Sequence, residues 1–307
     1  MDVIVTGSSG FVGRSLCPAL EAAGITVRRA PREVTGDINE HTDWGSIIEG
    51  ASAVIHLAAR VHVMRSEGTA SNGDEDGHYR TINTFASDRL ACAAERAGVR
   101  RFIFLSTAKV MGEASALPLT AEDPVNPQDI YAQSKWDAEQ AIAAAAKAME
   151  LVILRPPLVY GPNVRGNFLR LMKVIERGLP LPFGAISNLR SFISVGNLSG
   201  AIKHALTAPA GVYLPTDGED LSTSELIRRL AKTMNRPARL LAVPPTLLKF
   251  CSQLAGRHTD YQKLVDSLRL DGQMPGWQPA ESNRDALQAT ANWFLESRRN
   301  APIRDVN

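Results

Sequence analysis

Residues 3–13 read VIVTGSSGFVG, in which a short apolar run leads directly into glycines at positions 7, 10 and 13. The β-branched run predicts a buried strand, and the pattern from Phe11 to Ala23, closed by Gly24, predicts a helix. A glycine turn between strand and helix lets the backbone approach a pyrophosphate, which the N-terminus of the helix attracts. This stretch therefore predicts a dinucleotide-binding unit, with an ordinary glycine turn as the alternative.

Strands and helices alternate along the first half of the chain. Strands are expected at residues 25–29, 33–37, 53–57, 101–105 and 151–154, and helices at residues 78–97 and 129–149. This alternation predicts an α/β fold with a doubly wound parallel sheet of the Rossmann type.

The alternation loosens after about Pro156, where proline and glycine separate shorter elements. We expect a dinucleotide-binding domain over residues 1–156, a smaller and discontinuous α/β substrate domain over residues 157–297, and a frayed tail over residues 298–307. Residues 191–195 and a helix at 197–207 are expected to return to the main sheet. Residues 60–77 are polar and rich in glycine, which predicts a mobile loop that could close over a substrate.

Composition narrows the class of protein. The chain has 307 residues, 44% of them hydrophobic and 21% charged, with a net charge of +2, and these values favour neither a nucleic-acid nor a membrane partner. The first strand begins too early for a signal peptide, and no apolar run reaches the ~20 residues of a membrane span. The three cysteines include no CxxC pair, which predicts a cytoplasmic protein. The six histidines lack the spacing of metal ligands, so we expect no metal site.

Tyr131 and Lys135 stand four residues apart on the helix expected at 129–149, so they share one helix face. The lysine charge, together with that of an oxidised nicotinamide, would favour the phenolate of a tyrosine whose ordinary pKa is about 10. Combined with the glycine turn, the pair predicts an enzyme that moves a proton while the cofactor moves a hydride. A surface dyad without chemistry is the alternative.

The end of the second expected strand bears on the choice of cofactor. An acidic residue is expected about 20 residues after the glycine turn if the adenosine ribose carries a free 2′-hydroxyl. Residues 28–32 read RRAPR instead, and guanidinium groups suit a ribose 2′-phosphate. The sequence thus favours NADP, with Arg32 as first contact, and leaves NAD and a solvated strand end as alternatives.

Further motifs resemble the extended short-chain dehydrogenases/reductases, and within them the NAD-dependent epimerase/dehydratase family. The resemblance rests on the glycine spacing, on STAKVMG at 106–112, on YAQSK at 131–135, on RPPLVYGP at 155–162 and on GWQP at 276–279. It implies a homodimer formed through the helices at 78–97 and 129–149. It also implies cofactor contacts from the following residues: Gly7, Gly10, Phe11, Val12, Gly13, Asp37, Ile38, Leu57, Ala58, Ala59, Tyr131 and Lys135.

The same resemblance assigns the remaining roles. Thr107 would be the catalytic hydroxyl beside Tyr131 and Lys135, with Ser106 as its structural neighbour. Asn167 and Arg190 match residues that bind the diphosphate of a UDP-sugar, whereas Arg269 is a poor match to a second phosphate arginine. Other matches are structural: Asn83 matches a structural asparagine, and His56 and Trp277 are expected to pack in the core.

One departure from the family pattern narrows the reaction. Sugar-nucleotide 4,6-dehydratases carry Asp-Glu directly after the catalytic threonine, and here those positions are Ala108 and Lys109. What remains is redox chemistry at C4 of a UDP-sugar. The resemblance and the arginines favour NAD(P)H-dependent reduction of a UDP-4-keto-6-deoxy-N-acetylhexosamine for surface polysaccharide. A UDP-glucose or UDP-N-acetylglucosamine 4-epimerase with tightly bound NAD is the alternative, and a non-catalytic cofactor-binding partner protein is a distant third.

Overall fold

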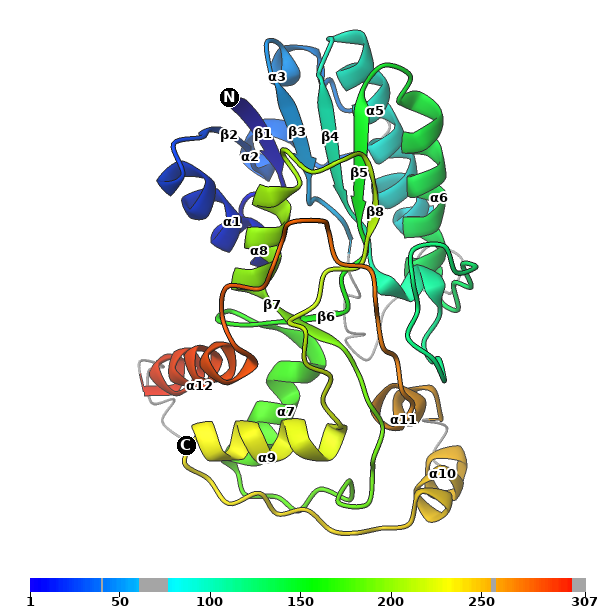
Figure 1. Cartoon of the computed structure of the whole chain (residues 1–307), viewed down its shortest axis with the longest axis vertical. Helices are drawn as coiled ribbons and strands as arrows, with labels where there is room; N and C mark the ends of the chain where they lie inside the picture. Colours follow the sequence, from blue (N-terminus) through cyan, green and yellow to red (C-terminus); the bar gives the residue numbers. More distant parts are fainter. Residues whose placement is uncertain (40, 61–76, 255–257, 300–307) are drawn as a thin grey trace, which may run out of the picture.

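A computed structural model describes residues 1–39, 41–60, 77–254 and 258–299 (Figure 1). Its centre is a parallel sheet of six strands. In spatial order these are β2 (Thr26–Ala30), β1 (Asp2–Thr6), β3 (Ala53–His56), β4 (Arg101–Leu105), β5 (Glu150–Leu154) and β8 (Gly211–Tyr213). Every neighbouring pair is parallel, which confirms the predicted doubly wound α/β fold.

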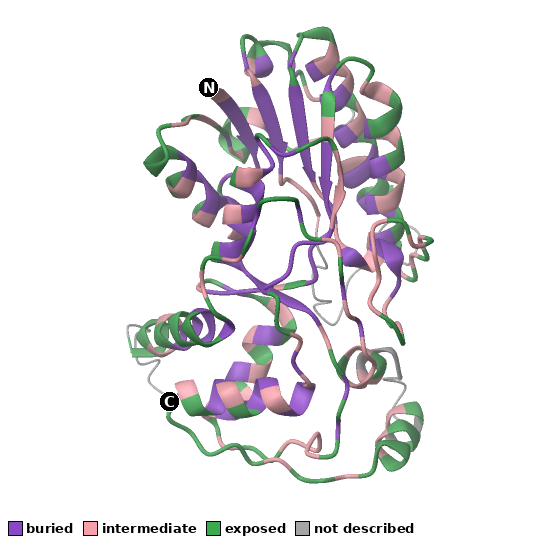
Figure 2. Cartoon of the chain, viewed as in Figure 1, coloured by how far each residue is buried: buried purple, intermediate pink, exposed green. Residues whose placement is uncertain are grey.

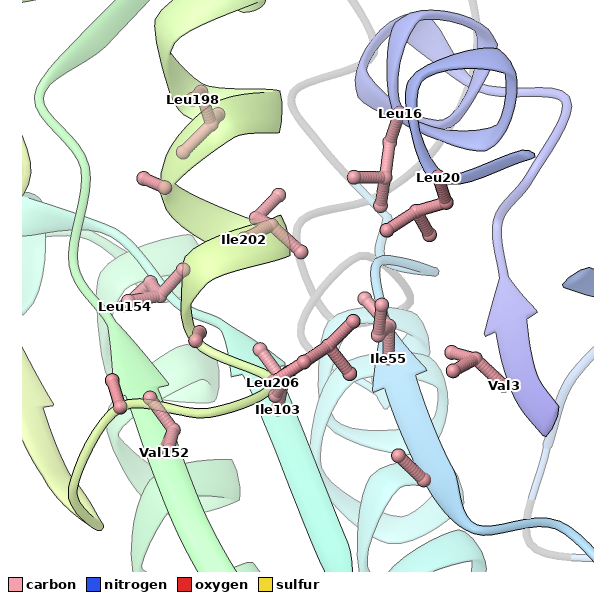
Figure 3. Packing of buried hydrophobic residues seen from close by; sticks show 14 of the residues in the cluster. Val3, Leu16, Leu20, Ile55, Ile103, Val152, Leu154, Leu198, Ile202 and Leu206 are labelled. Carbon is pink, nitrogen blue, oxygen red and sulfur yellow. The ribbon is translucent and has the colours of Figure 1, made fainter. Parts of the chain in front are cut away.

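Helices cover both faces of this sheet, so its central strands are buried on both sides (Figure 2). On one face α1 (Phe11–Ala22) and α8 (Val195–His204) pack their leucine and isoleucine side chains over β1, β3, β4 and β5 (Figure 3). On the other face lie α5 (Ala86–Arg96), which continues a π-helical turn η1 (Arg80–Phe85), and α6 (Ile130–Ala145). Burial on both faces explains why these strands read as apolar runs rather than alternating patterns.

The order of strands creates a topological switch point. β2 pairs with one edge of β1, and β3 pairs with the other. Ligands of open α/β sheets bind outside the carboxyl ends of the strands at such a point. The residues that follow β1, β3, β4 and β5 are therefore the place to look for a site.

A second hydrophobic core lies beyond that end of the sheet (Figure 1). It is built chiefly from α7 (Gly166–Glu176), α9 (Thr223–Thr233) and α12 (Asn283–Arg299). Around it lie the two-stranded sheet of β6 (Leu158–Tyr160) and β7 (Phe192–Ser194) and the helices α10 (Pro245–Leu254) and α11 (His258–Val265).

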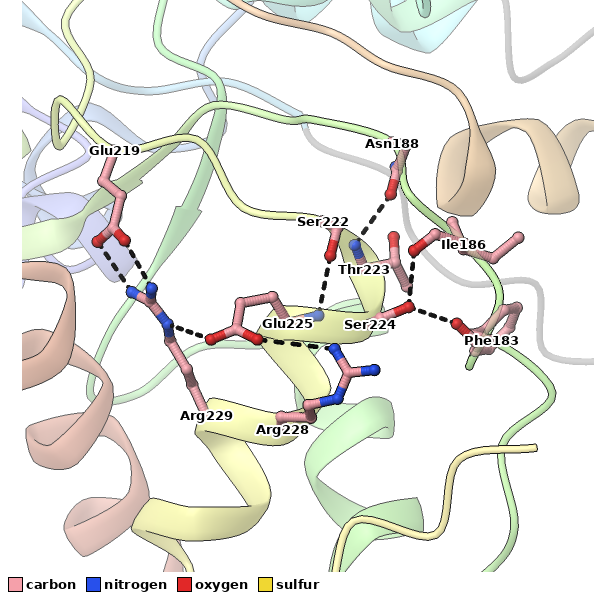
Figure 4. A network of polar contacts seen from close by, with 10 residues as sticks. All are labelled: Phe183, Ile186, Asn188, Glu219, Ser222, Thr223, Ser224, Glu225, Arg228 and Arg229. Carbon is pink, nitrogen blue, oxygen red and sulfur yellow. Dashed lines mark hydrogen bonds and ion pairs between the residues drawn. The ribbon is translucent and has the colours of Figure 1, made fainter. Parts of the chain in front are cut away.

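Polar contacts fix the start of α9 within this second unit (Figure 4). Ser222 caps the helix by accepting a hydrogen bond from the backbone N–H of Glu225 at 3.0 Å. Arg229 then binds Glu225 and, from outside the helix, Glu219. A Ser cap with a Glu three residues later is a local signal that starts a helix.

Two strand predictions were wrong. Residues 33–37 form no strand, because Pro31 starts the short helix α2 (Arg32–Thr35) and its carbonyl accepts hydrogen bonds from Val34 and Thr35. Residues 191–195 do not join the main sheet, since β7 pairs with β6. The sixth strand of the main sheet is instead β8, which the sequence pattern did not reveal.

Other expected elements hold with shifted ends. α6 stops at Ala145 rather than Met149, because the carboxylate of Glu95 accepts hydrogen bonds from the backbone N–H groups of residues 147–149. α12 includes Arg298 and Arg299 of the expected tail. Residues 61–76 of the expected mobile loop and residues 300–307 of the tail lie outside the described residues. None of the described helices combines the length and apolar character needed to cross a bilayer.

Candidate active site

The turn from β1 into α1 presents bare backbone at the switch point. Gly7 has a φ of +68°, and a Cβ atom there would lie 2.7 Å from the backbone nitrogen of Ala58. A Cβ atom on Gly13 would lie 2.5 Å from the carbonyl oxygen of Gly7. Gly10 is the N-cap of α1 and makes no side-chain cap, which leaves the first N–H groups of the helix to an anionic ligand. The turn thus fits the pyrophosphate of a dinucleotide.

The segment after β3 lies against this turn. The backbone N–H of Ala58 donates to Thr6 Oγ1 at 3.3 Å, which ties the end of β3 to the end of β1. Leu57, Ala58 and Ala59 are half-buried and follow the strand beside Gly7. The structure therefore brings together the two segments in which the sequence analysis expected cofactor contacts, with Phe11 and Val12 opening α1.

The two arginines in the second half of β2 are held by carboxylates or carbonyls. Arg28 pairs with Asp2 at 3.0 Å and donates to the carbonyl of Glu49 at 2.8 Å. Arg29 pairs with Glu21 at 2.8 Å.

Arg32, the first candidate for a 2′-phosphate contact, is 74% exposed and forms an ion pair with Asp37. Asp37 and the half-buried Ile38 are the expected adenine contacts, so these three candidates lie at one end of the site. Arg28, Arg29 and Arg32 are therefore each ion-paired with a carboxylate and do not form an open binding site for a 2′-phosphate.

Lys135 is a buried charged residue of the site. Its side chain is 1% exposed, and its Nζ lies 3.9 Å from the centroid of the Phe104 ring on β4. Tyr131 lies one turn earlier on α6 and is half-buried, with its ring 6.4 Å from that of Tyr79. The predicted pair thus lies on the side of α6 that faces the carboxyl end of β4.

Burial is the largest cause of the shifted pKa values of Lys135 and Tyr131. It lowers the pKa of Lys135 to about 7, and the carboxylate of Glu139 opposes that change. Burial likewise raises the pKa of Tyr131, and the charge of Asp129 adds to the rise. Burial and the neighbouring side chains Asp129 and Tyr79 therefore raise the pKa of Tyr131, and the expectation that the lysine and an oxidised nicotinamide together favour the phenolate stays a prediction.

Two hydroxyls follow β4, and the structure distinguishes them. Ser106 is buried and donates a hydrogen bond to Glu139, whose carboxylate also binds Arg155 at 2.6 Å. Thr107 is half-buried, and its hydroxyl oxygen accepts from the backbone N–H of Lys109 at 3.3 Å. Ser106 is committed to a buried ion pair, so Thr107 is the hydroxyl left at the site.

The candidate substrate residues come from the second unit. Asn167 is exposed in the first turn of α7. Arg190 is half-buried and donates to the carbonyl of Asp266 at 2.8 Å, and burial lowers the pKa of its guanidinium. The charge of Glu113 opposes this decrease in the pKa of Arg190. Arg269, the weak match, pairs with Asp220 at 2.7 Å.

A buried polar chain connects β1 to α6. Thr6 Oγ1 lies 2.6 Å from His56 Nδ1, His56 Nε2 lies 2.8 Å from Ser87 Oγ, and Ser87 donates to the carbonyl of Asn83. Asn83 then donates to Ser134, which sits between Tyr131 and Lys135 in the sequence. His56 also stacks on Phe104.

The predicted structural roles of Asn83 and His56 are consistent with this series of buried hydrogen bonds. Trp277 is 7% exposed and belongs to the main core, as expected.

The structure adds a charge cluster that the sequence analysis missed. Lys109 binds Asp129 at 2.6 Å and Glu113 at 2.9 Å. Asp129 is the N-cap of α6, because its Oδ1 accepts from the backbone N–H of Ala132 at 2.7 Å. An aspartate directly before a helical pattern signals a cap, but nothing local shows that Lys109 reaches it across 20 residues.

Several known proteins are similar to this chain over most of its length. The model of the NAD dependent epimerase/dehydratase family matches residues 3–216. A UDP-glucose 4-epimerase of Vibrio cholerae is 36% identical, with 96% of each chain covered. An N-acetyl-alpha-D-glucosaminyl-diphospho-ditrans,octacis-undecaprenol 4-epimerase of Escherichia coli O157:H7 is 27% identical over 88% of this chain and 84% of its own. The solved structure of MoeE5 with UDP-glucose and NAD is similar in fold, with a TM-score of 0.76, 23% identity, and coverage of 97% of this chain and 100% of its own.

The close approach at Gly7 predicts a specific loss. Gly7→Ala should destabilise the protein by more than the ~1–2 kcal/mol of a left-handed alanine, because its Cβ also meets Ala58, and should weaken NAD binding. Gly24→Ala is the matched control, since Gly24 has a φ of +76° but open space around it. Urea unfolding and calorimetric NAD titration measure both effects. Equal losses in the two variants would contradict the assigned contact.

Burial of His56 predicts acid sensitivity. Burial lowers the pKa of His56 to about 3 from its ordinary 6.5, so between these values the unfolded chain binds more protons than the folded protein. The free energy of unfolding should therefore fall as pH is lowered from 6.5 toward 3. His56→Gln should flatten that slope, whereas Thr6→Val should lower stability and keep the slope. Urea unfolding at several pH values tests this, and an unchanged slope in His56→Gln would refute it.

Proposed function

Because the chain belongs to the NAD-dependent epimerase/dehydratase family and is therefore an NAD-dependent enzyme, we propose that it is a 4-epimerase of a UDP-sugar. The observation that carries the proposal is the placement of Lys135. Its buried ammonium lies over the Phe104 ring of β4, and Tyr131, four residues earlier on α6, shares the helix face of Lys135. The 36% identity to a UDP-glucose 4-epimerase over nearly the whole chain supports the same reaction.

The proposed roles at the sugar follow from the chemistry of each side chain. When bound, NAD supplies a hydride acceptor at C4 and the positive charge of its oxidised ring. Tyr131 would take the proton of the C4 hydroxyl and return it to the oxygen of the epimer. Thr107 would donate a hydrogen bond to the same oxygen and so fix its position. Lys135 would hold the phenol in place. Because burial lowers the pKa of the Lys135 ammonium to about 7, this lysine would also exchange a proton near neutral pH.

The proposed cofactor contacts run along the switch point. The glycine turn would hold the pyrophosphate, Arg32, Asp37 and Ile38 would lie at the adenosine end, and Tyr131 with Lys135 would lie at the nicotinamide end. The remaining contacts would come from Gly7, Gly10, Phe11, Val12, Gly13, Leu57, Ala58 and Ala59. Asn167 and Arg190 would bind the diphosphate of the UDP-sugar, a task that suits an arginine.

The epimerase stands first here although the arginine-rich strand end favoured a reductase. Arg28 and Arg29 have carboxylate partners and Arg32 is paired with Asp37, which weakens the argument for a 2′-phosphate. The reductase of a UDP-4-keto-6-deoxy-N-acetylhexosamine remains the second candidate. One observation favours it: no carboxylate follows β2 directly, and exposed Arg32 stands there instead. The expected homodimer and cytoplasmic location stay predictions.

The cofactor found in the purified protein separates the two candidates. An epimerase should retain NAD and convert UDP-glucose or UDP-N-acetylglucosamine to its C4 epimer without net oxidation. A reductase should oxidise one NAD(P)H for each 4-keto sugar reduced. Liquid chromatography of the sugars and absorbance of the reduced cofactor measure both. Loss of cofactor on gel filtration, with turnover only when NADPH is added, would reject the epimerase.

Removing the phenol hydroxyl tests the acid/base role. Tyr131→Phe should lower turnover by at least ~100-fold, as expected when a general acid/base is lost, while NAD binding stays intact. Tyr213→Phe is the control, because the hydroxyl of Tyr213 contacts only the nearby carbonyl of Pro209 among the described residues. Wild-type turnover in Tyr131→Phe would exclude this tyrosine from the mechanism.

A further inference from the structure

We propose that α10, together with the segment that leads into it, binds the surface of an anionic phospholipid bilayer. Two groups of exposed side chains form this part of the protein, the apolar Leu241, Leu247 and Phe250 and the basic Lys232, Arg236, Arg239 and Lys249. We call them the α10 surface. The inference concerns where the protein binds and does not depend on the sugar that it converts.

The charge of the α10 surface differs from that of the whole chain. The net charge of +2 is an average, because residues 226–254 contain six lysines or arginines and no aspartate or glutamate, so the rest of the chain is net negative. Arg228 and Arg229 are paired with carboxylates at the start of α9 (Figure 4). The other four basic residues are exposed and form no ion pair with another described residue. This charge is complementary to an anionic surface.

The apolar side chains of the α10 surface are exposed to solvent. Leu247 and Phe250 are 51% and 58% exposed and stand three residues apart on α10, so they share one helix face. Leu241, in the segment before the helix, is also more than half exposed. Leucine and phenylalanine beside a lysine are typical of a helix that lies in a membrane interface. The apolar groups enter the acyl boundary there, and the ammonium stays among the headgroups.

Backbone hydrogen bonds attach this surface to the second unit. The N–H of Leu181 donates to the carbonyl of Arg239 at 2.8 Å, and the N–H of Leu241 donates to the carbonyl of Leu181 at 2.9 Å. The hydroxyl of Tyr261 on α11 donates to the carbonyl of Pro245, the first residue of α10, at 2.8 Å. The exposed groups therefore extend from a backbone that is fixed in the fold.

The α10 surface lies at the end of the molecule that is farthest from the N-terminal ends of the main strands (Figure 1). Residues 234–244 run along that end into α10, and both are mostly exposed (Figure 2). The candidate active site lies at the carboxyl ends of the main strands instead. A bilayer against the α10 surface would therefore leave the glycine turn and Tyr131 accessible.

Charge argues against two other occupants of the α10 surface. In a symmetric dimer formed through it, the basic groups of one copy would face those of the other, and like charges repel. Nucleic acid would pair its phosphates with the basic groups but would leave the leucines and the phenylalanine without an apolar partner. An anionic bilayer satisfies both kinds of side chain.

Sedimentation with lipid vesicles tests the proposal on the full-length, NAD-bound protein. The wild type should sediment with vesicles of phosphatidylglycerol and phosphatidylcholine, but not with vesicles of phosphatidylcholine alone. Raising NaCl to about 0.5 M should weaken binding, because salt screens exposed charges. Leu247→Ser with Phe250→Ser should weaken it by at least ~10-fold through lost apolar burial. Arg239→Gln and Lys249→Gln should each weaken it by roughly fivefold.

Matched controls come from exposed residues outside the α10 surface. Leu117 is 74% exposed, and Arg100 is an exposed arginine directly before β4. Leu117→Ser and Arg100→Gln should bind vesicles as the wild type does. Because all of these side chains are exposed, urea unfolding and NAD binding should be unchanged in every variant.

The outcomes separate the bilayer from other partners. Binding that requires anionic lipid and is weakened only in the α10-surface variants would support the proposal. Wild-type protein that stays in the supernatant, or equal binding by all variants, would overturn it. Self-association without vesicles that Leu247→Ser with Phe250→Ser abolishes would assign the surface to a second copy and would also overturn it. Equally tight binding to soluble polyglutamate would overturn it in favour of an acidic protein.

Discussion

The buried ammonium of Lys135 against the Phe104 ring is the contact on which the site depends. It fixes α6 to β4 at the level where that strand ends, so the helix carries Tyr131 toward the segment that begins with Thr107. A desolvated lysine is costly unless its surroundings compensate. Here the aromatic face and the carboxylate of Glu139 do so, and Glu139 is in turn held by Arg155. The geometry of the candidate site and the packing of the core therefore depend on the same contacts.

Burial favours the packing of this site but opposes the charged forms of its tyrosine and lysine. Low exposure orders the tyrosine and the lysine, but it also moves the pKa of Tyr131 up and that of Lys135 down, away from an ion pair. Charges close to the phenol then matter more than they would in water. The carboxylate of Asp129, the N-cap of α6, is one such charge, because it adds to the raised pKa of Tyr131.

Some of the site could be predicted because its signals are local. The glycines at 7, 10 and 13 and the spacing of Tyr131 and Lys135 belong to single elements, where a turn or a helix face determines the geometry. Helix ends that depend on distant partners were misjudged. α6 ends at Ala145 because Glu95 from another helix binds the backbone beyond it, and no local pattern contains that information.

The sequence by itself determined the parallel sheet, the glycine turn and the position of Tyr131 and Lys135 on one helix, because periodicity and glycine spacing are properties of contiguous residues. Tertiary structure alone decided three things: the pairing of β8 with β5, the separate β6–β7 sheet, and the partners of the arginines in β2. It also brought Lys109 to Asp129. Strand pairing and ion pairing join residues that are distant in sequence, so only the folded arrangement selects among the partners that the chain offers.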